Sequence, residues 1–282
     1  MRKSVLVAVA IAMLLAACGK AKQSNVTLGE TSSSPGASTS AAPGSSKAPK
    51  ASAAPGTTKA PSASSSSSSG TKNVTTPKPA SQGGANPPKD GTYTYRTDGN
   101  SNSPQTGPQT YTNQTVTSKI SHSGNVYSTA QSTNQGTSTS KNQWTSTEVL
   151  FLSININSPY GTFSCTYNPP LVITKFPTKP ETFPQQKLDG SGNACGGTLD
   201  ISVLRKENVT DAAGHTWSAW LYHVKITSSF TYNGAPVTSK SDEMRWFSPD
   251  IGVQVKSVAD TTMTSALGTT TGHSTTLLKT RP

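Results

Sequence analysis

The sequence predicts a single all-β domain, a curved antiparallel sheet, behind a long disordered segment. All 18 aromatic residues lie between Tyr93 and Phe247, so residues 1–90 lack the large side chains that a packed core needs. From Thr92 onward, apolar and polar residues alternate with period two, which is the pattern of strands covered on one face. No stretch of helical length shows helical apolar spacing without Gly, Pro or a β-branched run.

The N-terminus has the pattern of an export signal. Met1-Arg2-Lys3 is basic, residues 5–15 are apolar, and Leu15-Ala16-Ala17-Cys18 follows. This pattern resembles the signal of bacterial lipoproteins. The resemblance implies that residues 1–17 form a cleaved signal peptide and that Cys18 carries acyl chains such as palmitate. These chains would anchor the protein at the extracytoplasmic face of the bacterial cell membrane. The alternative is a plain signal peptide that is cleaved after Ala17.

Residues 18–90 are predicted to be the lipidated Cys18 followed by a disordered tether. The segment is rich in Ser, Ala, Pro, Thr and Lys, and it cannot offset the entropy of ordering by burying apolar surface. Residues 1–90 as a whole carry most of the net charge of +11, with 10 Lys and Arg against 2 acidic residues. Nucleic-acid binding needs a basic face with aromatics on a folded module. The charge pattern therefore argues against a nucleic-acid partner.

Residues 91–282 are predicted to form the β-rich globular domain, whose strands follow one another through short turns. The longest alternation covers residues 220–232, and Asn233-Gly234 is the preferred pair for a two-residue hairpin turn. Leu150, Leu152, Ile154 and Ile156 are expected to share one face. Further strands are expected at 92–96, 199–203, 237–247, 253–255 and from 268 to about 279, with a short helical turn near 179–186. Such a meander forms a half-barrel or an open barrel.

Two segments carry a second resemblance. Residues 91–99, GTYTYRTDG, and residues 246–256, WFSPDIGVQVK, are similar to parts of uncharacterised lipoproteins from high-GC Gram-positive bacteria. The second segment also looks like the closing hairpin of half-barrels of the lipoprotein-carrier type (LolA/LolB-like). The resemblance implies a curved antiparallel sheet around an apolar hollow and supplies no catalytic residues.

Cys165 and Cys195 are an even pair in an exported domain, which predicts a disulfide. It would staple the least regular part of the domain, which is rich in Pro and Gly. The alternative is a catalytic thiol with His215, the nearest histidine in sequence.

The sequence contains no pattern that predicts catalysis, a cofactor or a metal site. The four histidines lack metal-ligand spacing, and two Ser-x-x-Lys matches, at Ser69 and Ser138, are expected by chance in a chain this rich in Ser. Adjacent strand residues face opposite sides, so Asp242 and Glu243 cannot converge. Both are interpreted as solvated surface charges, as is Asp189.

One aromatic face has two interpretations, a plain core or the lining of a hollow for an acyl chain or other amphiphile. Its members alternate on one predicted strand and its hairpin partner: Trp220, Tyr222, Val224, Ile226, Phe230, Tyr232 and Trp246. We expect an envelope lipoprotein whose β domain binds a lipid or other hydrophobic ligand without catalysis. The alternative is a structural or protein-interaction lipoprotein that has a cell-wall or envelope protein as partner and no small-molecule ligand. An enzyme is the third hypothesis.

Overall fold

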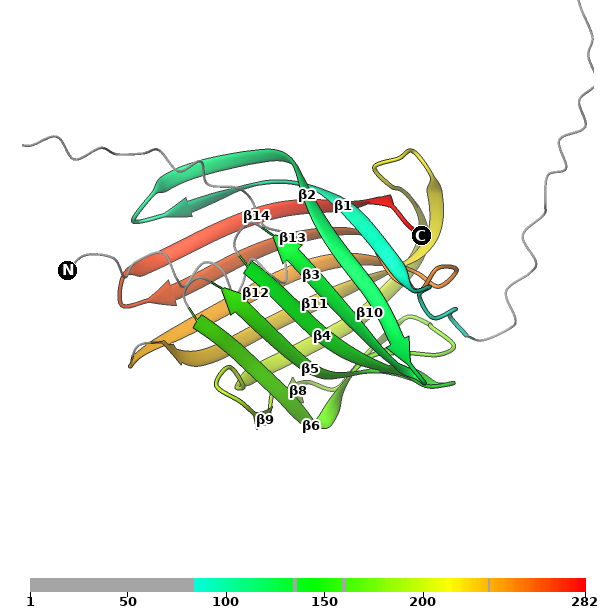
Figure 1. Ribbon diagram of the computed structural model, residues 1–282, viewed down its shortest axis with the longest axis horizontal. Coiled ribbons are helices and arrows are strands. Elements are labelled where there is room, and N and C mark those ends of the chain that lie inside the picture. The colour runs from blue at the N-terminus through cyan, green and yellow to red at the C-terminus, as the bar shows by residue number, and fades with distance from the viewer. Residues whose placement is uncertain (1–83, 134–135, 159–160, 233) are drawn as a thin grey trace, which may run out of the picture. The chain divides into compact units, whose positions relative to one another are not determined.

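The computed structural model describes residues 84–133, 136–158, 161–232 and 234–282 of the chain. Within these ranges it contains strands and turns but no helix, so the all-β prediction is confirmed. All strands belong to one antiparallel sheet, which is strongly curved and is not closed (Figure 1). The predicted signal peptide, Cys18 and the tether up to residue 83 lie outside the described residues.

The sheet consists of two meanders, in each of which every strand pairs with the next one along the chain. The first meander contains β1 (Gly91–Ser103), β2 (Gly107–Ser123), β3 (Val126–Thr133), β4 (Gly136–Trp144), β5 (Glu148–Ser158) and β6 (Gly161–Lys175). The second contains β10 (Gly197–Thr210), β11 (Thr216–Tyr232), β12 (Ala235–Ser248), β13 (Val253–Ser265) and β14 (Gly268–Thr280). The predicted meander is therefore confirmed.

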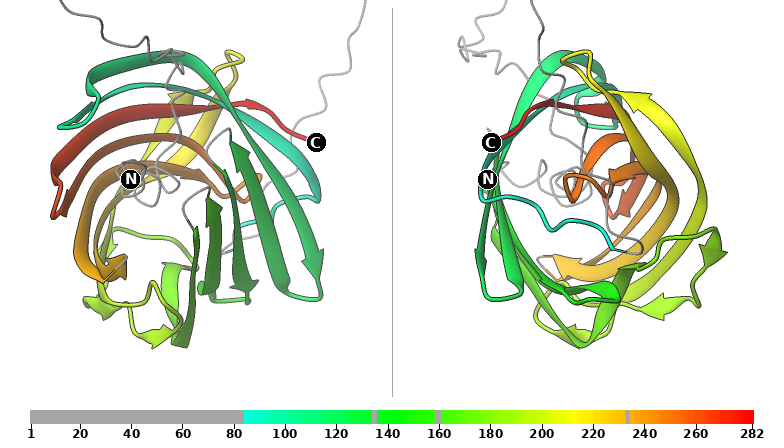
Figure 2. Two further views of the ribbon diagram at one scale, coloured as in Figure 1. Left: turned by 60° about the vertical axis from the view of Figure 1, so that its left-hand side comes forward. Right: turned by 90° about the vertical axis from the view of Figure 1, so that its right-hand side faces the viewer.

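The two meanders are joined by the pairing of the first strand with the last. β1 and β14 pair from Thr94 opposite Thr280 to Asn102 opposite Thr271. In the middle of this pairing, the buried hydroxyls of Thr97 and Thr276 lie 3.1 Å apart, although the two residues are 179 positions apart in sequence. As a result, β1 and β14 lie side by side in the middle of the curved sheet (Figure 2).

The segment between β6 and β10 covers the two outer edges of the sheet. Its short strands β7 (Glu181–Thr182) and β8 (Gln186–Lys187) pair with β10, and β9 (Gly190–Ser191) pairs with β6. The disulfide Cys165–Cys195 links β6 to the end of this segment. The helical turn expected at 179–186 was a wrong prediction. Part of this stretch is extended because β7 and β8 pair with the backbone of β10. In addition, Pro180 and Pro184 lack the N–H that a helical hydrogen bond needs.

The turn between β11 and β12 fixes which residues share a face. Tyr232 pairs with Ala235 across a two-residue turn, in which Gly234 has a φ of 79°. This register places even-numbered residues of β11 opposite odd-numbered residues of β12. Trp220 therefore pairs with Phe247, and Leu221 pairs with Trp246.

A register shift changes the face that β5 buries. The sequence predicts that Leu150, Leu152, Ile154 and Ile156 share one face, but the pairing of β5 with β6 shifts between Phe151 and Ser153. The extra residue of a bulge reverses the alternation on one side of it. Phe151 therefore lies in the same interior wall as Ile154 and Ile156, and the four-residue set is corrected.

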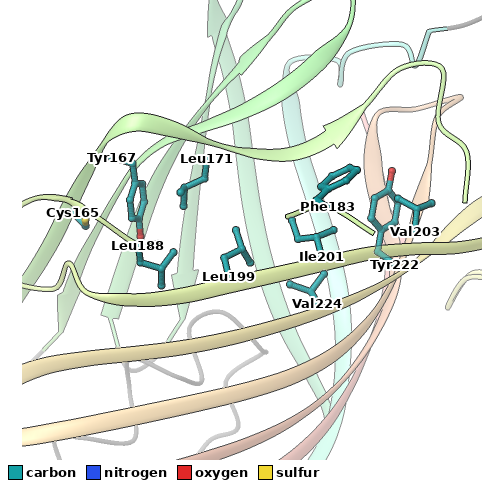
Figure 3. Close-up of a cluster of buried hydrophobic side chains, with 10 residues drawn as sticks. All are labelled: Cys165, Tyr167, Leu171, Phe183, Leu188, Leu199, Ile201, Val203, Tyr222 and Val224. Carbon is teal, nitrogen blue, oxygen red and sulfur yellow. The ribbon is translucent and has the colours of Figure 1, made fainter. Parts of the chain in front are cut away.

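Buried apolar side chains gather in three clusters on the sheet. The largest joins β6, β10 and β11 with the segment between β6 and β10 and includes Leu171, Phe183, Ile201 and Tyr222 (Figure 3). A second contains Ile156, Phe163, Phe230, Val237 and Met263. A third includes Tyr93, Val209, Ala219, Val255 and Leu278. The first cluster thus packs side chains from both outer edges of the sheet against each other.

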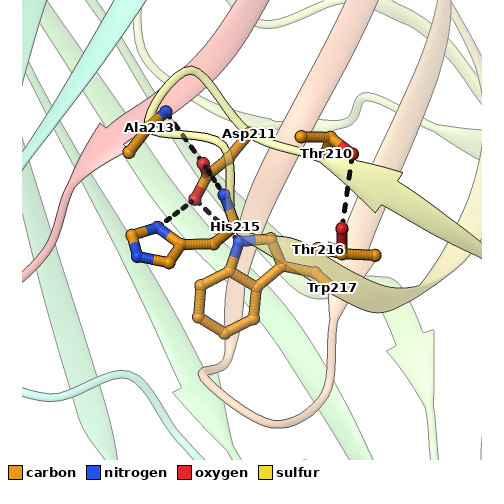
Figure 4. A network of polar contacts seen from close by, with 6 residues as sticks. All are labelled: Thr210, Asp211, Ala213, His215, Thr216 and Trp217. Atoms are coloured by element: carbon orange, nitrogen blue, oxygen red, sulfur yellow. Dashed lines mark hydrogen bonds and ion pairs between the residues drawn. The ribbon is translucent and has the colours of Figure 1, made fainter. Parts of the chain in front are cut away.

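The turn between β10 and β11 is organised by one buried carboxylate. Asp211 accepts hydrogen bonds from the backbone N–H groups of Ala213 and His215, both at 2.9 Å, and from Nε1 of Trp217 at 2.8 Å (Figure 4). The backbone N–H of Ala212 donates to the carbonyl of Leu278 at 2.8 Å. The turn is therefore fastened to β14.

The residues just before β1 pack against the turn between β12 and β13. The backbone N–H of Asn86 donates to the carbonyl of Pro249 at 2.8 Å, and its side-chain amide donates to the carbonyl of Asp250 at 3.1 Å. Gly252 has a φ of 67°, and a Cβ there would lie 2.2 Å from the carbonyl oxygen of Asn86. Residues 84–90, which the sequence assigns to the tether, thus contact the β domain.

The disulfide is expected to stabilise the domain by restricting the unfolded chain. A double variant, Cys165→Ala with Cys195→Ala, opens a loop of 30 residues and should lower the free energy of unfolding by about 3–4 kcal/mol. Urea denaturation of the oxidised proteins measures the difference. Wild-type protein treated with reductant should unfold at the same urea concentration as the variant. Equal midpoints for oxidised wild type and variant would contradict the prediction.

Asp211 should contribute stability that is lost in acid. Burial alone would raise its pKa, but the hydrogen bonds from Trp217, His215 and Ala213 together outweigh burial and lower the pKa below the ordinary 3.8. A lowered pKa stabilises the fold above the ordinary value and loses this effect as the pH falls through the folded value. Asp211→Asn should therefore cost about 1–3 kcal/mol at neutral pH and less as the pH falls below the ordinary pKa of 3.8.

The measurement is urea denaturation of wild type and Asp211→Asn at neutral and acidic pH. Asp189→Asn, at an exposed carboxylate, serves as the matched control and should leave stability nearly unchanged. A difference between Asp211→Asn and wild type that stays constant down to the acid limit would overturn the assignment.

Candidate functional site

The curved sheet encloses a cavity of about 450 Å³. Its wall contains side chains from both meanders and from the segment between β6 and β10. The cavity therefore depends on the whole sheet and not on a single hairpin.

One part of the wall is apolar. It comes from β5 and β6 on one side of the open edge of the sheet and from β10 and β11 on the other. Its members include Phe151, Ile154, Ile156, Leu171, Leu199, Ile201, Val224 and Ile226. A surface of this composition suits a hydrocarbon chain.

Another part of the wall is polar and uncharged. It comes from β2, β3 and β4, which also contribute Val116, Ile120, Tyr127 and Trp144 to the wall. The polar members are hydroxyl and amide side chains: Ser118, Thr129, Gln131, Thr133, Ser138, Ser140 and Asn142. Ser118 pairs with Gln131 across β2 and β3, and Gln131 pairs with Ser138 across β3 and β4. The polar side chains thus form one continuous patch, which we call the hydroxyl–amide patch.

A buried ion pair lies in the same interior. Glu243 on β12 is 1% exposed, and its carboxylate accepts hydrogen bonds from Oγ of Ser241 at 2.7 Å and from Nε of Arg245 at 2.6 Å. Arg245 lines the cavity. The interpretation of Glu243 as a solvated surface charge was therefore wrong. Period two places it on the buried face of β12 with Val237 and Ser241, and Arg245 compensates its charge.

Asp242, the neighbour of Glu243, lies on the other face and is exposed. Its carboxylate is 2.7 Å from Nε2 of His223 and 3.7 Å from Nζ of Lys225. The two adjacent acids therefore do not converge, as their spacing predicted.

Three of the phenols around the cavity have raised pKa values. Burial raises the pKa of Tyr95 and Tyr167 above the ordinary value. Burial likewise raises the pKa of Tyr222, although a hydrogen bond with the hydroxyl of Thr174 opposes the shift. The cavity therefore offers neutral hydroxyls and one compensated ion pair.

Two polar atoms of the wall lack hydrogen-bond partners among the described residues. They are Oγ of Ser118, a residue that is 2% exposed, and Oδ1 of Asn142. A buried polar atom without a partner carries a free-energy cost that a ligand or water can relieve. Both residues belong to the hydroxyl–amide patch.

The predicted ligand face is divided by the structure. Tyr222, Val224 and Ile226 line the cavity. Trp220 is half-buried against the first cluster, and Phe230 packs in the second cluster, outside the cavity wall. The side chain of Tyr232 lies outside the described residues.

Trp246 does not share this face, which corrects the prediction. Its indole N–H donates to the carboxylate of Glu207 at 2.5 Å and lowers the pKa of that carboxyl. Nζ of Lys256 lies 4.6 Å from the centre of its ring system. The two-residue hairpin turn pairs even with odd positions, so Phe247 takes the place in the cavity wall that the sequence assigned to Trp246.

The sequence prediction missed most of the cavity wall, both its apolar residues on β5, β6 and β10 and its polar residues on β2, β3 and β4. Asn142 lies on β4, where Ser and Thr occupy both faces, so hydropathy does not mark the inner one, whereas Ser118 lies between Val116 and Ile120 on the buried face of β2. The signal that could have found Arg245 is the alternation of β12, in which it follows Val237, Ser241 and Glu243 on one face.

The motifs that the sequence suggested for chemistry are not assembled. Ser138 is buried and faces the cavity, whereas Lys141, three residues later, is exposed. Cys165 and Cys195 are bonded to each other. Across the described ranges, no group of three or more His, Cys, Asp or Glu could hold a metal ion. The same ranges contain no helix that is long and apolar enough to cross a membrane.

A smaller hollow of about 250 Å³ lies at the turn between β10 and β11, beside residues 278–281. Both carboxylate oxygens of Asp211 at this hollow already accept hydrogen bonds, and Arg281 stacks over Trp217 with 5.1 Å between the guanidinium carbon and the ring. These contacts make the hollow a structural feature of the turn. The central cavity is the candidate site.

No family model, curated protein sequence or solved structure matches this chain.

Proposed function

We propose that this protein is a membrane-anchored envelope lipoprotein whose β domain holds a lipid or other hydrophobic ligand without catalysis. The observation that carries the proposal is the cavity of about 450 Å³ inside the curved sheet. Protein interiors are normally packed with few voids larger than a water molecule. A hollow of this volume lies within the ~300–1,000 Å³ range of small-molecule sites.

The lining supports a ligand with a hydrocarbon part. Leu199, Ile201, Val224 and Ile226 present aliphatic surface to the hollow. The walls come from strands that are tied together by the β1–β14 pairing and by the disulfide, so the hollow is built into the fold. A hydrophobic ligand would gain about 25 cal/mol for each Å² of apolar surface that it removes from water.

The alternative is a structural or protein-interaction lipoprotein without a small-molecule ligand. A docking surface of this kind would show as a contiguous exposed apolar patch. Leu204 on β10 and Leu267 at the turn before β14 are the exposed large apolar side chains among the described residues. They lie on different hairpins, so the observations favour the ligand-binding function.

The anchor is proposed from the resemblance of residues 1–18 to a lipoprotein signal. Attachment to a membrane through Cys18 fits a domain that follows a long polar segment rich in Ser and Pro. Acyl chains at Cys18 would keep the domain at the membrane surface, where hydrophobic ligands are found.

The direct test of the function is native mass spectrometry of the protein purified from its own host. A lipid that co-purifies at one per chain supports the proposal. A chain that remains free of ligand, together with a co-purified envelope protein, would favour the interaction alternative.

The anchor can be tested by Cys18→Ser. The variant lacks the thiol that receives the acyl chains, so we expect it to be released from membranes or to remain uncleaved. Fractionation of cells and the apparent mass of the protein measure both outcomes. A variant that still partitions with membranes as a protein of mature size would refute lipidation at Cys18.

The cavity can be tested with two variants on β11 and the uncharged dye Nile red. Ile226→Phe adds atoms to the hollow, so dye affinity should fall while overpacking costs less than the usual ~1–3 kcal/mol. Phe230→Ala removes a side chain from the second cluster and should cost about 3–5 kcal/mol of stability while changing dye affinity less than Ile226→Phe does. Dye titration and urea denaturation separate the two effects. If Ile226→Phe leaves dye binding unchanged, the dye does not occupy the cavity.

A further inference from the structure

The lining of the cavity indicates what kind of amphiphile it would hold, an inference that rests on the proposed function. We propose that the ligand is a single-chain amphiphile with an uncharged head group that bears hydroxyls. The hydrocarbon chain would lie against the apolar wall of β5, β6, β10 and β11, and the head group against the hydroxyl–amide patch of β2, β3 and β4.

The hydroxyl–amide patch is the first reason for a polar head group. A purely apolar ligand would cover these side chains without replacing their hydrogen bonds to water, and that loss opposes binding. The patch is continuous across three paired strands, because Gln131 lies beside Ser118 on one neighbour and Ser138 on the other. A head group with several polar atoms could therefore bond to several strands at once.

The unpartnered atoms specify hydroxyls. Oδ1 of Asn142 can only accept a hydrogen bond, so a head group that pairs with it after a small side-chain movement brings a donor. Oγ of Ser118 can donate or accept. A hydroxyl-bearing head group supplies both functions, whereas an ester or ether supplies acceptors alone.

The buried ion pair specifies an uncharged head group. Arg245 is the one charged side chain of the described cavity wall, and its Nε is 2.6 Å from the carboxylate of Glu243. An anionic head group that drew Arg245 away would leave Glu243, at 1% exposure, without its counter-ion. A cationic head group would meet the guanidinium itself. The pair therefore leaves the cavity without a net charge to compensate.

The volume favours one chain. A cavity of about 450 Å³ lies toward the lower end of the ~300–1,000 Å³ that small-molecule sites span. Each further acyl chain would need additional apolar wall of the kind that β5, β6, β10 and β11 provide.

The experiment compares three amphiphiles that share one chain and differ in the head group. Monolauroylglycerol has hydroxyls and no charge, laurate is anionic, and dodecyltrimethylammonium is cationic. Each is titrated below its micelle concentration against residues 19–282, the mature chain without its lipidated Cys18, carrying Nile red. We expect monolauroylglycerol to displace the dye at a concentration about tenfold lower than either charged amphiphile, the ratio that corresponds to one or two added hydrogen bonds.

Two variants test the named groups. Asn142→Leu should weaken monolauroylglycerol about three- to tenfold more than it changes the affinity of Nile red, and Asn155→Leu, at an exposed residue of β5, is the matched control. Glu243→Gln removes the charge that compensates Arg245, so laurate should bind at least about tenfold more tightly than to wild type. If Glu243→Gln does not fold, the comparison of the three amphiphiles on wild type still decides the proposal.

The outcomes separate this inference from the proposed function. If Nile red binds but laurate or dodecyltrimethylammonium displaces it as well as monolauroylglycerol does, the head-group inference is overturned and the ligand-binding function stands. If Asn142→Leu and Asn155→Leu weaken monolauroylglycerol equally, the hydroxyl–amide patch does not contact the head group. If neither Nile red nor any amphiphile binds, the proposed function fails and the inference fails with it.

Discussion

The pairing of β1 with β14 is the contact on which the rest of the structure depends. It joins the two meanders in the middle of the sheet and connects residues such as Thr97 and Thr276, which are 179 positions apart. Without it, each meander would be a separate sheet with a free edge, and the walls of the cavity would not face a common interior. Because β1 and β14 are so far apart in sequence, this central contact forms only when the first and the last strand of the β domain are both present.

The two outer edges of the sheet, at β6 and β10, are held together without backbone pairing between them. β6 and β10 do not pair with each other, and the segment between them supplies short strands to each, a disulfide to β6 and the side chains of Phe183 and Leu188 to the first cluster. The apolar wall of the cavity is built from strands on either side of this opening. Side-chain packing and one covalent bond thus hold the sheet in its curve where backbone pairing does not.

The interior contains more polar groups than a filled core would tolerate, and most of them are satisfied in pairs. Thr97 faces Thr276, Tyr222 bonds to Thr174, and Glu243 is bonded to Ser241 and Arg245. A buried polar group needs such partners, because an unpaired one costs free energy. Four buried polar atoms of the described residues lack hydrogen-bond partners, on Arg96, Ser118, Asn142 and Ser248, and two of these residues, Ser118 and Asn142, line the cavity. An interior of this kind suits a ligand that is partly polar.

The sequence by itself determined the fold class, the meander order, the hairpin at Asn233-Gly234 and the cysteine pair, because these follow from period-two alternation, local turn chemistry and an even number of free thiols. The tertiary structure decided which face is inside. Hairpin register placed Phe247 and not Trp246 in the cavity wall, a bulge brought Phe151 into line with Ile154, and Glu243 was buried beside Arg245. In β3 and β4, both faces are rich in Ser and Thr, so hydropathy could not mark the inner one. Only pairing between distant strands determines which of two similar faces lines a common interior.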